Sequence, residues 1–160
     1  MYSAATVANV FLDLANEDAK PLTHMKIQKL VYISHGWNLA LSGDALSYDS
    51  IRAWQYGPVI PNLYAELKRF GGRPVTEKVP LLPTQAEIDP AGPEMRIVRM
   101  VWRSYGKLAA PTLSAITHKP DTPWSVTWSE NPYGTINDEV IKQHYLKLKD
   151  ERFRPKRQPA

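Results

Sequence analysis

The sequence predicts a mainly α fold: a single globular domain of about six helices around a central helix at about residues 23–42, with a small two-stranded β element. Two observations lead to this prediction. The chain has 160 residues, 43% of them hydrophobic, and a chain of this length buries roughly 70% of its unfolded surface without a disulfide or a metal. Apolar residues also recur at helical spacing in most segments.

The first two helices are the most clearly marked. Apolar residues at helical spacing predict a first helix from about Ser3 to Asn16. Thr23 is placed to cap a second helix, which Gly43 ends. This second helix has a wide apolar stripe and another on its far side, so we expect it to be central. Its narrow polar strip consists of His24, Gln28 and His35.

The β element is expected in the middle of the chain. Residues 51–55 alternate side-chain type as a short strand does, and Tyr56, Gly57 and Pro58 then form a turn. Residues 75–79 are predicted as the second strand.

The remaining elements follow from spacing and helix signals. A third helix begins at Pro61 and ends at Gly71, and residues 80–93, with four prolines, are expected to be an exposed connection. Later helices are predicted over about 98–108, 111–116, 122–124 and 136–148. We therefore assign one domain to residues 3–148 and a basic, disordered tail to residues 149–160.

The distribution of charge along the chain argues against a folded domain that binds a polyanion. The chain carries a formal charge of +4, but residues 142–160 hold seven basic and two acidic residues, so the rest is close to neutral at −1. The chain has no cysteine, no apolar run of membrane-spanning length and no recognisable secretory signal. We expect a cytoplasmic protein.

No motif of an enzyme or cofactor-binding protein is present. The sequence has neither a phosphate-binding glycine loop nor a Gly-x-Ser-x-Gly elbow. His24 and His35 are three helical turns apart, about 16 Å, which is too far to share one metal ion. We therefore expect no catalytic residue, no cofactor and no metal site.

Two kinds of binding remain open. Arg52 beside Trp54 and Tyr56 resembles the mix of charge and aromatic rings in nucleic-acid-binding surfaces, although packing onto the helices explains the same pattern. A protein-binding surface uses the same residue types. The aromatic residues in or beside loops are Trp54, Tyr56, Tyr64, Trp124, Trp128 and Tyr133, and we expect at least half of them in the core.

Two segments carry a family resemblance. The first is Pro21-Leu22-Thr23 followed by Lys26-Ile27-Gln28-Lys29-Leu30, Tyr32 and Gly36, and the second is Ala53-Trp54-Gln55-Tyr56-Gly57-Pro58-Val59 with Tyr64 and Gly71. Together they resemble the Panacea antitoxin domain family, which includes phage-associated GepA-like proteins and the SocA antitoxin. The similarity extends from about residue 3 to 148 and includes Pro123-Trp124.

The resemblance implies a mostly helical antitoxin that neutralises a cognate protein toxin by direct contact. In SocA-like proteins it also implies a proteolytic adaptor that delivers the toxin to a ClpXP-type protease. A nucleic-acid-binding regulator is the third hypothesis. Partner-contact candidates are Lys26, Lys29, Arg52, Trp54, Tyr56 and Tyr64. Structural roles are expected for Thr23, Leu30, Tyr32, Gly36, Gly57, Pro58 and Trp124.

Overall fold

A computed structural model describes residues 1–153 of the chain, and this part is mainly α-helical. Its elements in chain order are α1 (Ala4–Glu17), α2 (His24–Ser42), β1 (Arg52–Trp54), β2 (Gly57–Val59), α3 (Pro61–Leu67), the 3-10 helix η1 (Lys68–Phe70), α4 (Pro93–Tyr105), α5 (Ala110–His118), α6 (Pro123–Glu130) and α7 (Asp138–Phe153). The predicted fold class, mainly α with a small two-stranded sheet, is confirmed.

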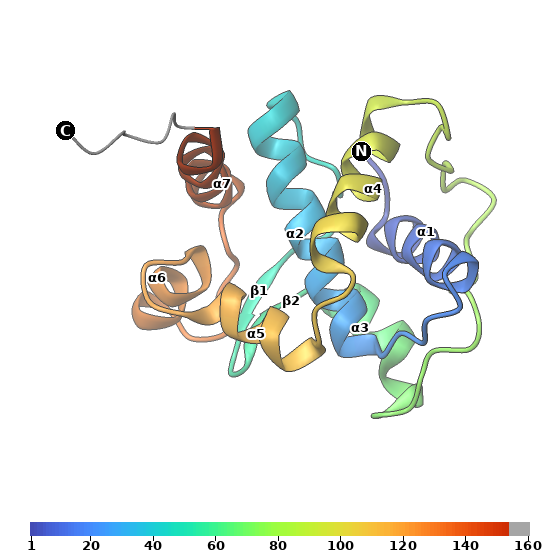
Figure 1. Ribbon diagram of the computed structural model, residues 1–160. Helices are drawn as coiled ribbons and strands as arrows, with labels where there is room; N and C mark the ends of the chain where they lie inside the picture. The colour runs from blue at the N-terminus through green and yellow to red at the C-terminus, as the bar shows by residue number, and fades with distance from the viewer. Residues whose placement is uncertain (154–160) are drawn as a thin grey trace.

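Helix α2 is the centre of the fold, as predicted. Helices α1 and α7 lie on opposite sides of α2, and α4 packs against α2 in front (Figure 1). All residues of α2 from Ile27 to Ala40 are buried, including Leu30 and Tyr32. The two apolar stripes and the polar strip between them are therefore all covered by other elements.

A glycine allows α7 to approach α2 closely. A Cβ atom on Gly36 would lie only 2.2 Å from the ring of Tyr145. The Tyr145 ring also meets the edges of two other rings of α2, with centroid distances of 6.3 Å to Tyr32 and 5.3 Å to Trp37. Gly36 therefore provides the space for the packing of the Tyr145 ring against α2.

Both ends of α2 fall close to the predicted places. Thr23 occupies the N-cap position with an extended backbone, but its side chain makes no capping hydrogen bond. The expected capping role of Thr23 is thus limited to its backbone, whose carbonyl accepts from Ile27 N. At the other end, Gly43 adopts a left-handed φ of 83° and donates its N–H to the carbonyl of Leu39.

The second predicted strand, 75–79, is wrong. The partner of β1 is β2, which pairs antiparallel with Arg52 opposite Val59 and Trp54 opposite Gly57. Residues 75–79 are irregular, and their backbone is held by α1: the side chain of Asn9 donates to the carbonyl of Val79 and accepts from its N–H. The buried valines of this segment resemble the residues on one face of a strand. However, the backbone of Val79 is hydrogen-bonded to the Asn9 side chain, and Val75 N donates to Leu22 O in the loop before α2.

The remaining segments agree in part with expectation. Residues 80–92 contain no helix or strand, and Pro93 begins α4. Helix α7 runs to Phe153, so the first residues of the stretch 149–160, predicted as a disordered tail, are helical. Residues 154–160 lie outside the described part of the chain. Within residues 1–153 no helix is both long and apolar enough to cross a membrane.

Candidate functional site

The β hairpin presents two residues of its first strand outward. Arg52 is exposed and Trp54 half-buried, whereas Ala53 between them is fully buried, as the two-residue period of a strand requires. Gln55 and Tyr56 form the two-residue turn between Trp54 and Gly57. The positive φ of 122° at Gly57 suits glycine, since L side chains rarely adopt it.

Helix α2 holds the hairpin from the inside through two adjacent polar residues. The Gln28 amide accepts a hydrogen bond from Ile60 N at 3.0 Å and donates to Ile60 O at 3.4 Å. The ammonium of Lys29 donates to the carbonyl of Pro58 at 2.9 Å. These contacts join the two segments that carry the family resemblance, so the segments form one structural unit.

Lys29 is an unusual buried cation. Its side chain is fully buried, and among residues 1–153 it has no carboxylate partner. Burial lowers the pKa of the Lys29 ammonium from 10.5 to about 8. A Cβ atom on residue 57 would lie 3.0 Å from Nζ of Lys29, so Gly57 also leaves room for the ammonium beneath the turn.

The outer edge of the hairpin is covered by residues 133–136. Ala53 donates its N–H to Gly134 O and accepts at its carbonyl from Tyr133 N, both at 2.9 Å. Tyr133 has a left-handed φ of 65°, which is uncommon for a bulky residue. Since α2 covers β2 and this segment covers β1, neither edge is open to strand addition.

Side chains are consequently what the hairpin offers to a partner. The indole N–H of the buried Trp124 donates to Trp54 O and holds α6 against β1. Trp128 stacks on Trp124 with a centroid distance of 5.5 Å, and Tyr133 meets the Trp128 ring at 5.1 Å. We call the outward residues of this cluster the hairpin surface: Arg52, Trp54, Tyr56, Trp128 and Tyr133.

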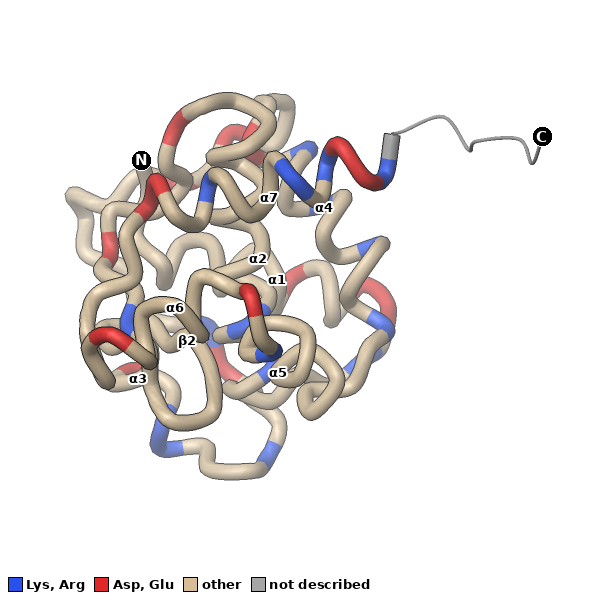
Figure 2. Tube along the Cα trace, turned by 90° about the vertical axis from the view of Figure 1, so that its left-hand side faces the viewer, with Lys and Arg blue, Asp and Glu red and all other residues tan. Residues whose placement is uncertain are grey.

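The hairpin surface is aromatic and nearly uncharged. Tyr56 is 67% exposed and Tyr133 is 52% exposed. The hairpin contains one charged residue, Arg52, and α6 contains one, Glu130. Figure 2 shows the chain around β2 and α6 as mostly uncharged, with short acidic and basic segments interspersed over the rest of the visible face. Aromatic residues with an arginine are typical of protein-binding surfaces.

The six predicted partner-contact residues are not all brought together. Arg52, Trp54 and Tyr56 lie on the hairpin surface. Tyr64 lies behind Trp54, with ring centroids 5.0 Å apart. Lys29 lies in the interior, as described, so its ammonium has no access to a partner in this conformation.

Lys26 contributes to the packing of two helices. Its ammonium donates to the carbonyl of Gly106 at the end of α4 and lies 6.0 Å from the centroid of the Trp102 ring. The indole N–H of Trp102 in turn donates to the Asp18 carboxylate at 2.7 Å. Lys26 thereby satisfies a carbonyl left open at a helix end.

Several residues of this region were not assigned from sequence. Trp128 and Tyr133 are predicted from sequence only as aromatic residues near loops, and nothing along the chain indicates that Tyr133 lies beside Arg52 with Trp128 packed against it. The Ser114 hydroxyl, which donates to Tyr56 O and supports the turn, carried no sequence signal. The adjacent polar residues Gln28 and Lys29 are the sequence feature that could have indicated these hydrogen bonds to the hairpin, because polar groups on a buried helix need hydrogen-bond partners.

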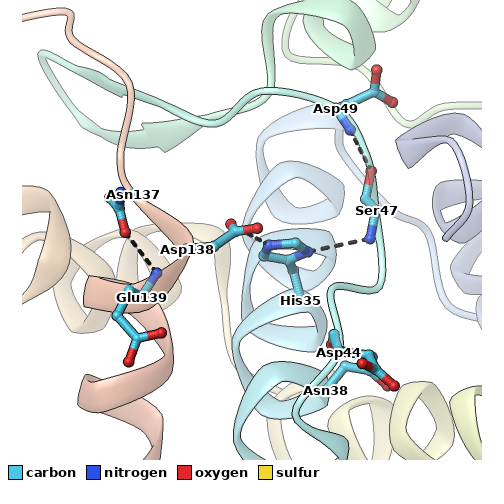
Figure 3. Close-up of polar contacts among 8 residues, drawn as sticks. All are labelled: His35, Asn38, Asp44, Ser47, Asp49, Asn137, Asp138 and Glu139. Atoms are coloured by element: carbon cyan, nitrogen blue, oxygen red, sulfur yellow. Dashed lines mark hydrogen bonds and ion pairs between the residues drawn. The ribbon is translucent and has the colours of Figure 1, made fainter.

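A second polar cluster lies around His35, away from the hairpin turn. In Figure 3 the imidazole lies between Asp138 at the start of α7 and Ser47 in the loop after α2. His35 Nδ1 accepts from Ser47 N at 3.2 Å, so Nε2 carries the proton that it donates to Asp138 Oδ1 at 2.8 Å. The Ser47 hydroxyl accepts from Asp49 N and makes no hydrogen bond to His35.

The His35 cluster therefore has the residue types of a nucleophilic triad but not its geometry. The His35 side chain is 1% exposed, and its hydrogen bonds connect α2 to the following loop and to α7. Within the described residues no group of three His, Asp or Glu side chains is arranged to hold a metal ion.

Comparison with known proteins identifies relatives. The family model described as "Antitoxin SocA-like, Panacea domain" matches residues 27–125, which include Gln28, Lys29 and the hairpin that they hold. The Antitoxin SocA of Caulobacter vibrioides (strain NA1000 / CB15N) is 28% identical over an alignment 160 positions long, which covers 89% of this chain and 81% of that protein. No solved structure matches this chain at a significant level.

Proposed function

This chain belongs to the SocA-like antitoxin family with a Panacea domain, and from that premise we propose that it is an antitoxin that neutralises a cognate protein toxin by direct binding. We propose the cytoplasm as the place of action, because toxin and antitoxin must meet where the toxin acts. No cofactor takes part in this function.

The observation that carries the proposal is the hairpin surface. It combines two well-exposed tyrosines with two half-buried tryptophans and an arginine, the residue types that dominate binding energy at protein interfaces. Its backbone is held by hydrogen bonds from α2 on one side and residues 133–136 on the other. A pre-organised surface loses little conformational entropy on binding, which favours tight association.

The same observation favours a protein over a nucleic acid as the partner. Single-stranded nucleic acids bind where aromatic rings alternate with several cations along a positively charged groove. On the hairpin surface Arg52 is the sole cation, and Glu130 of the adjacent α6 offsets its charge. We therefore assign the surface to the toxin.

The first experiment is purification of the tagged full-length protein from its own cells with nuclease present. We expect recovery of a small, stoichiometric protein that stops growth when it is produced alone. Recovery of nuclease-sensitive material alone would contradict the antitoxin function. Co-recovered protease subunits, with a toxin half-life that changes when this protein is deleted, would indicate that neutralisation proceeds by delivery to a ClpXP-type protease.

The second experiment locates the contact surface with the recovered toxin. We expect Tyr56→Ala and Trp54→Ala to weaken toxin binding at least about tenfold, as central aromatic residues of interfaces commonly do. Leu82→Ala is the matched control, because Leu82 is 66% exposed and lies on the connection between η1 and α4. Folded variants with full toxin neutralisation would remove the hairpin surface as the contact site.

A further inference from the structure

The outward face of α4 carries a row of basic side chains. Arg96, Arg99 and Arg103 are exposed and spaced by three and four residues, and the exposed Lys107 continues the row just past the helix end. At about 100° per residue the four positions fall within roughly 80° of one another, along about 16 Å of helix axis. We call these four residues the basic stripe.

The arginines of the basic stripe differ from the other arginines of the described chain. Arg52 donates to Tyr133 O, Arg69 pairs with Glu77, Arg73 donates to Phe70 O, and Arg152 lies 5.3 Å from the centroid of the Trp37 ring. Within residues 1–153, no side-chain hydrogen bond, ion pair or ring contact involves Arg96, Arg99 or Arg103. Their guanidinium groups are available to a ligand.

The arrangement of the stripe is unfavourable for an isolated helix. Each neighbouring pair in the row has like charges at a spacing of three or four residues, which disfavours the helix. Along the chain, no Asp or Glu occurs between Glu94 and Asp121. The carboxylate of Asp18, which lines the same small pocket as Arg103 and Lys107 at one end of the row, already accepts a hydrogen bond from the Trp102 indole. An anionic partner along the row would remove this repulsion.

We propose that the basic stripe docks an acidic segment of a protein partner, at a site separate from the hairpin surface. A guanidinium group binds a carboxylate through two parallel hydrogen bonds, so a row of arginines suits a row of carboxylates. Successive members of the stripe are about 4.5–6 Å apart along the axis, which matches glutamates spaced by three or four residues on a partner helix.

The stripe is a poorer fit for a nucleic acid. No large exposed aromatic side chain lies on α4, so bases would find no ring to stack on. Four cations in one straight row also neutralise fewer phosphates than the roughly 6–10 contacted by typical duplex-binding proteins.

The test measures binding of a fluorescent, helix-forming peptide that carries glutamates at every third or fourth position to the full-length protein. We expect R96Q/R99Q/R103Q to weaken peptide binding at least about tenfold at moderate salt, because it removes the three guanidinium groups that would each form two hydrogen bonds with a carboxylate. Glutamine keeps the helix propensity high, and circular dichroism checks the fold. The control is K68Q/K119Q/K147Q, which removes the same charge from three exposed lysines on other parts of the chain.

The control should change affinity less than about twofold, as expected for screened, distant charges. An equal loss in both triple variants would show a net-charge effect and overturn the proposal. Tighter binding of a single-stranded oligonucleotide of equal charge, abolished by R96Q/R99Q/R103Q, would overturn the assignment to a protein partner. Since the toxin takes no part in this test, its failure is distinct from failure of the antitoxin function.

Discussion

Helix α2 and the hairpin surface use their polar and aromatic side chains in opposite ways. In α2 even the polar residues Gln28, Lys29 and His35 are buried, and the side chain of each is hydrogen-bonded to another segment of the chain. On the hairpin surface, backbone groups of Ala53, Trp54 and Tyr56 are hydrogen-bonded to other segments, while the Tyr56 and Tyr133 side chains extend into solvent. One element therefore positions the other: α2 holds the hairpin in place, and the hairpin exposes the side chains that we propose as contacts.

The largest effect on stability is expected from filling the space at Gly36. A methyl group there meets the buried Tyr145 ring at 2.2 Å, so we expect Gly36→Ala to lower the free energy of unfolding by roughly 3 kcal/mol. Gly43→Ala is the control, because nothing lies within 4 Å of its added Cβ and only the left-handed φ is strained; its expected cost is about 1 kcal/mol. Urea denaturation of both variants measures the difference, and equal costs would contradict the close-packing argument.

A smaller effect is expected from the buried cation of α2. Because the pKa of Lys29 is lowered to about 8 in the folded protein, the unfolded chain holds a proton that the folded chain has lost between pH 8 and 10.5. The free energy of unfolding should therefore rise with pH, by about 1–2 kcal/mol between about pH 7.5 and about pH 9.5.

Variants at two lysines isolate this contribution. Lys29→Met should remove most of the rise, because only the smaller contribution of Lys26, whose pKa burial also lowers, then remains. Lys68→Met, at an exposed position, should keep the full rise. Chemical denaturation at the two pH values measures each protein. A rise of the same size in Lys29→Met would assign the titration to another group.

The smallest effect is expected on the hairpin surface itself. Arg52→Ala and Tyr56→Ala remove exposed side chains whose contacts with the rest of the chain are few. Each should change the free energy of unfolding by less than about 0.5 kcal/mol. Thermal or urea unfolding checks this directly, and a loss comparable with that of Gly36→Ala would mean that these side chains support the fold.

The difference between the two regions also explains what the sequence was able to predict. The helices followed from apolar spacing and from local stop signals such as Gly43, which act within a few residues. The central place of α2 followed from its apolar residues on two sides. These are local properties, and the structure agrees with them.

The errors arose where a residue's environment depends on distant segments. Gly57 and Pro58 are atypical of strands, yet they form β2 because Lys29 and Gln28 hold this segment from below. Lysines are usually exposed, so the spacing of Lys29 gave no reason to place it in the core. Tyr133 meets Arg52 only through the fold, at a sequence separation that no local pattern reports, and Trp128 in turn packs against Tyr133.

The contact between His35 and Asp138 has a consequence for synthesis on the ribosome. These partners are 103 residues apart in the chain, and α7 provides the last cover of α2. At about 5–20 residues per second, α2 leaves the ribosome several seconds or more before α7 exists to cover it. During that interval the Tyr32 and Trp37 side of the nascent helix is uncovered apolar surface, of the kind that makes incomplete chains prone to aggregation.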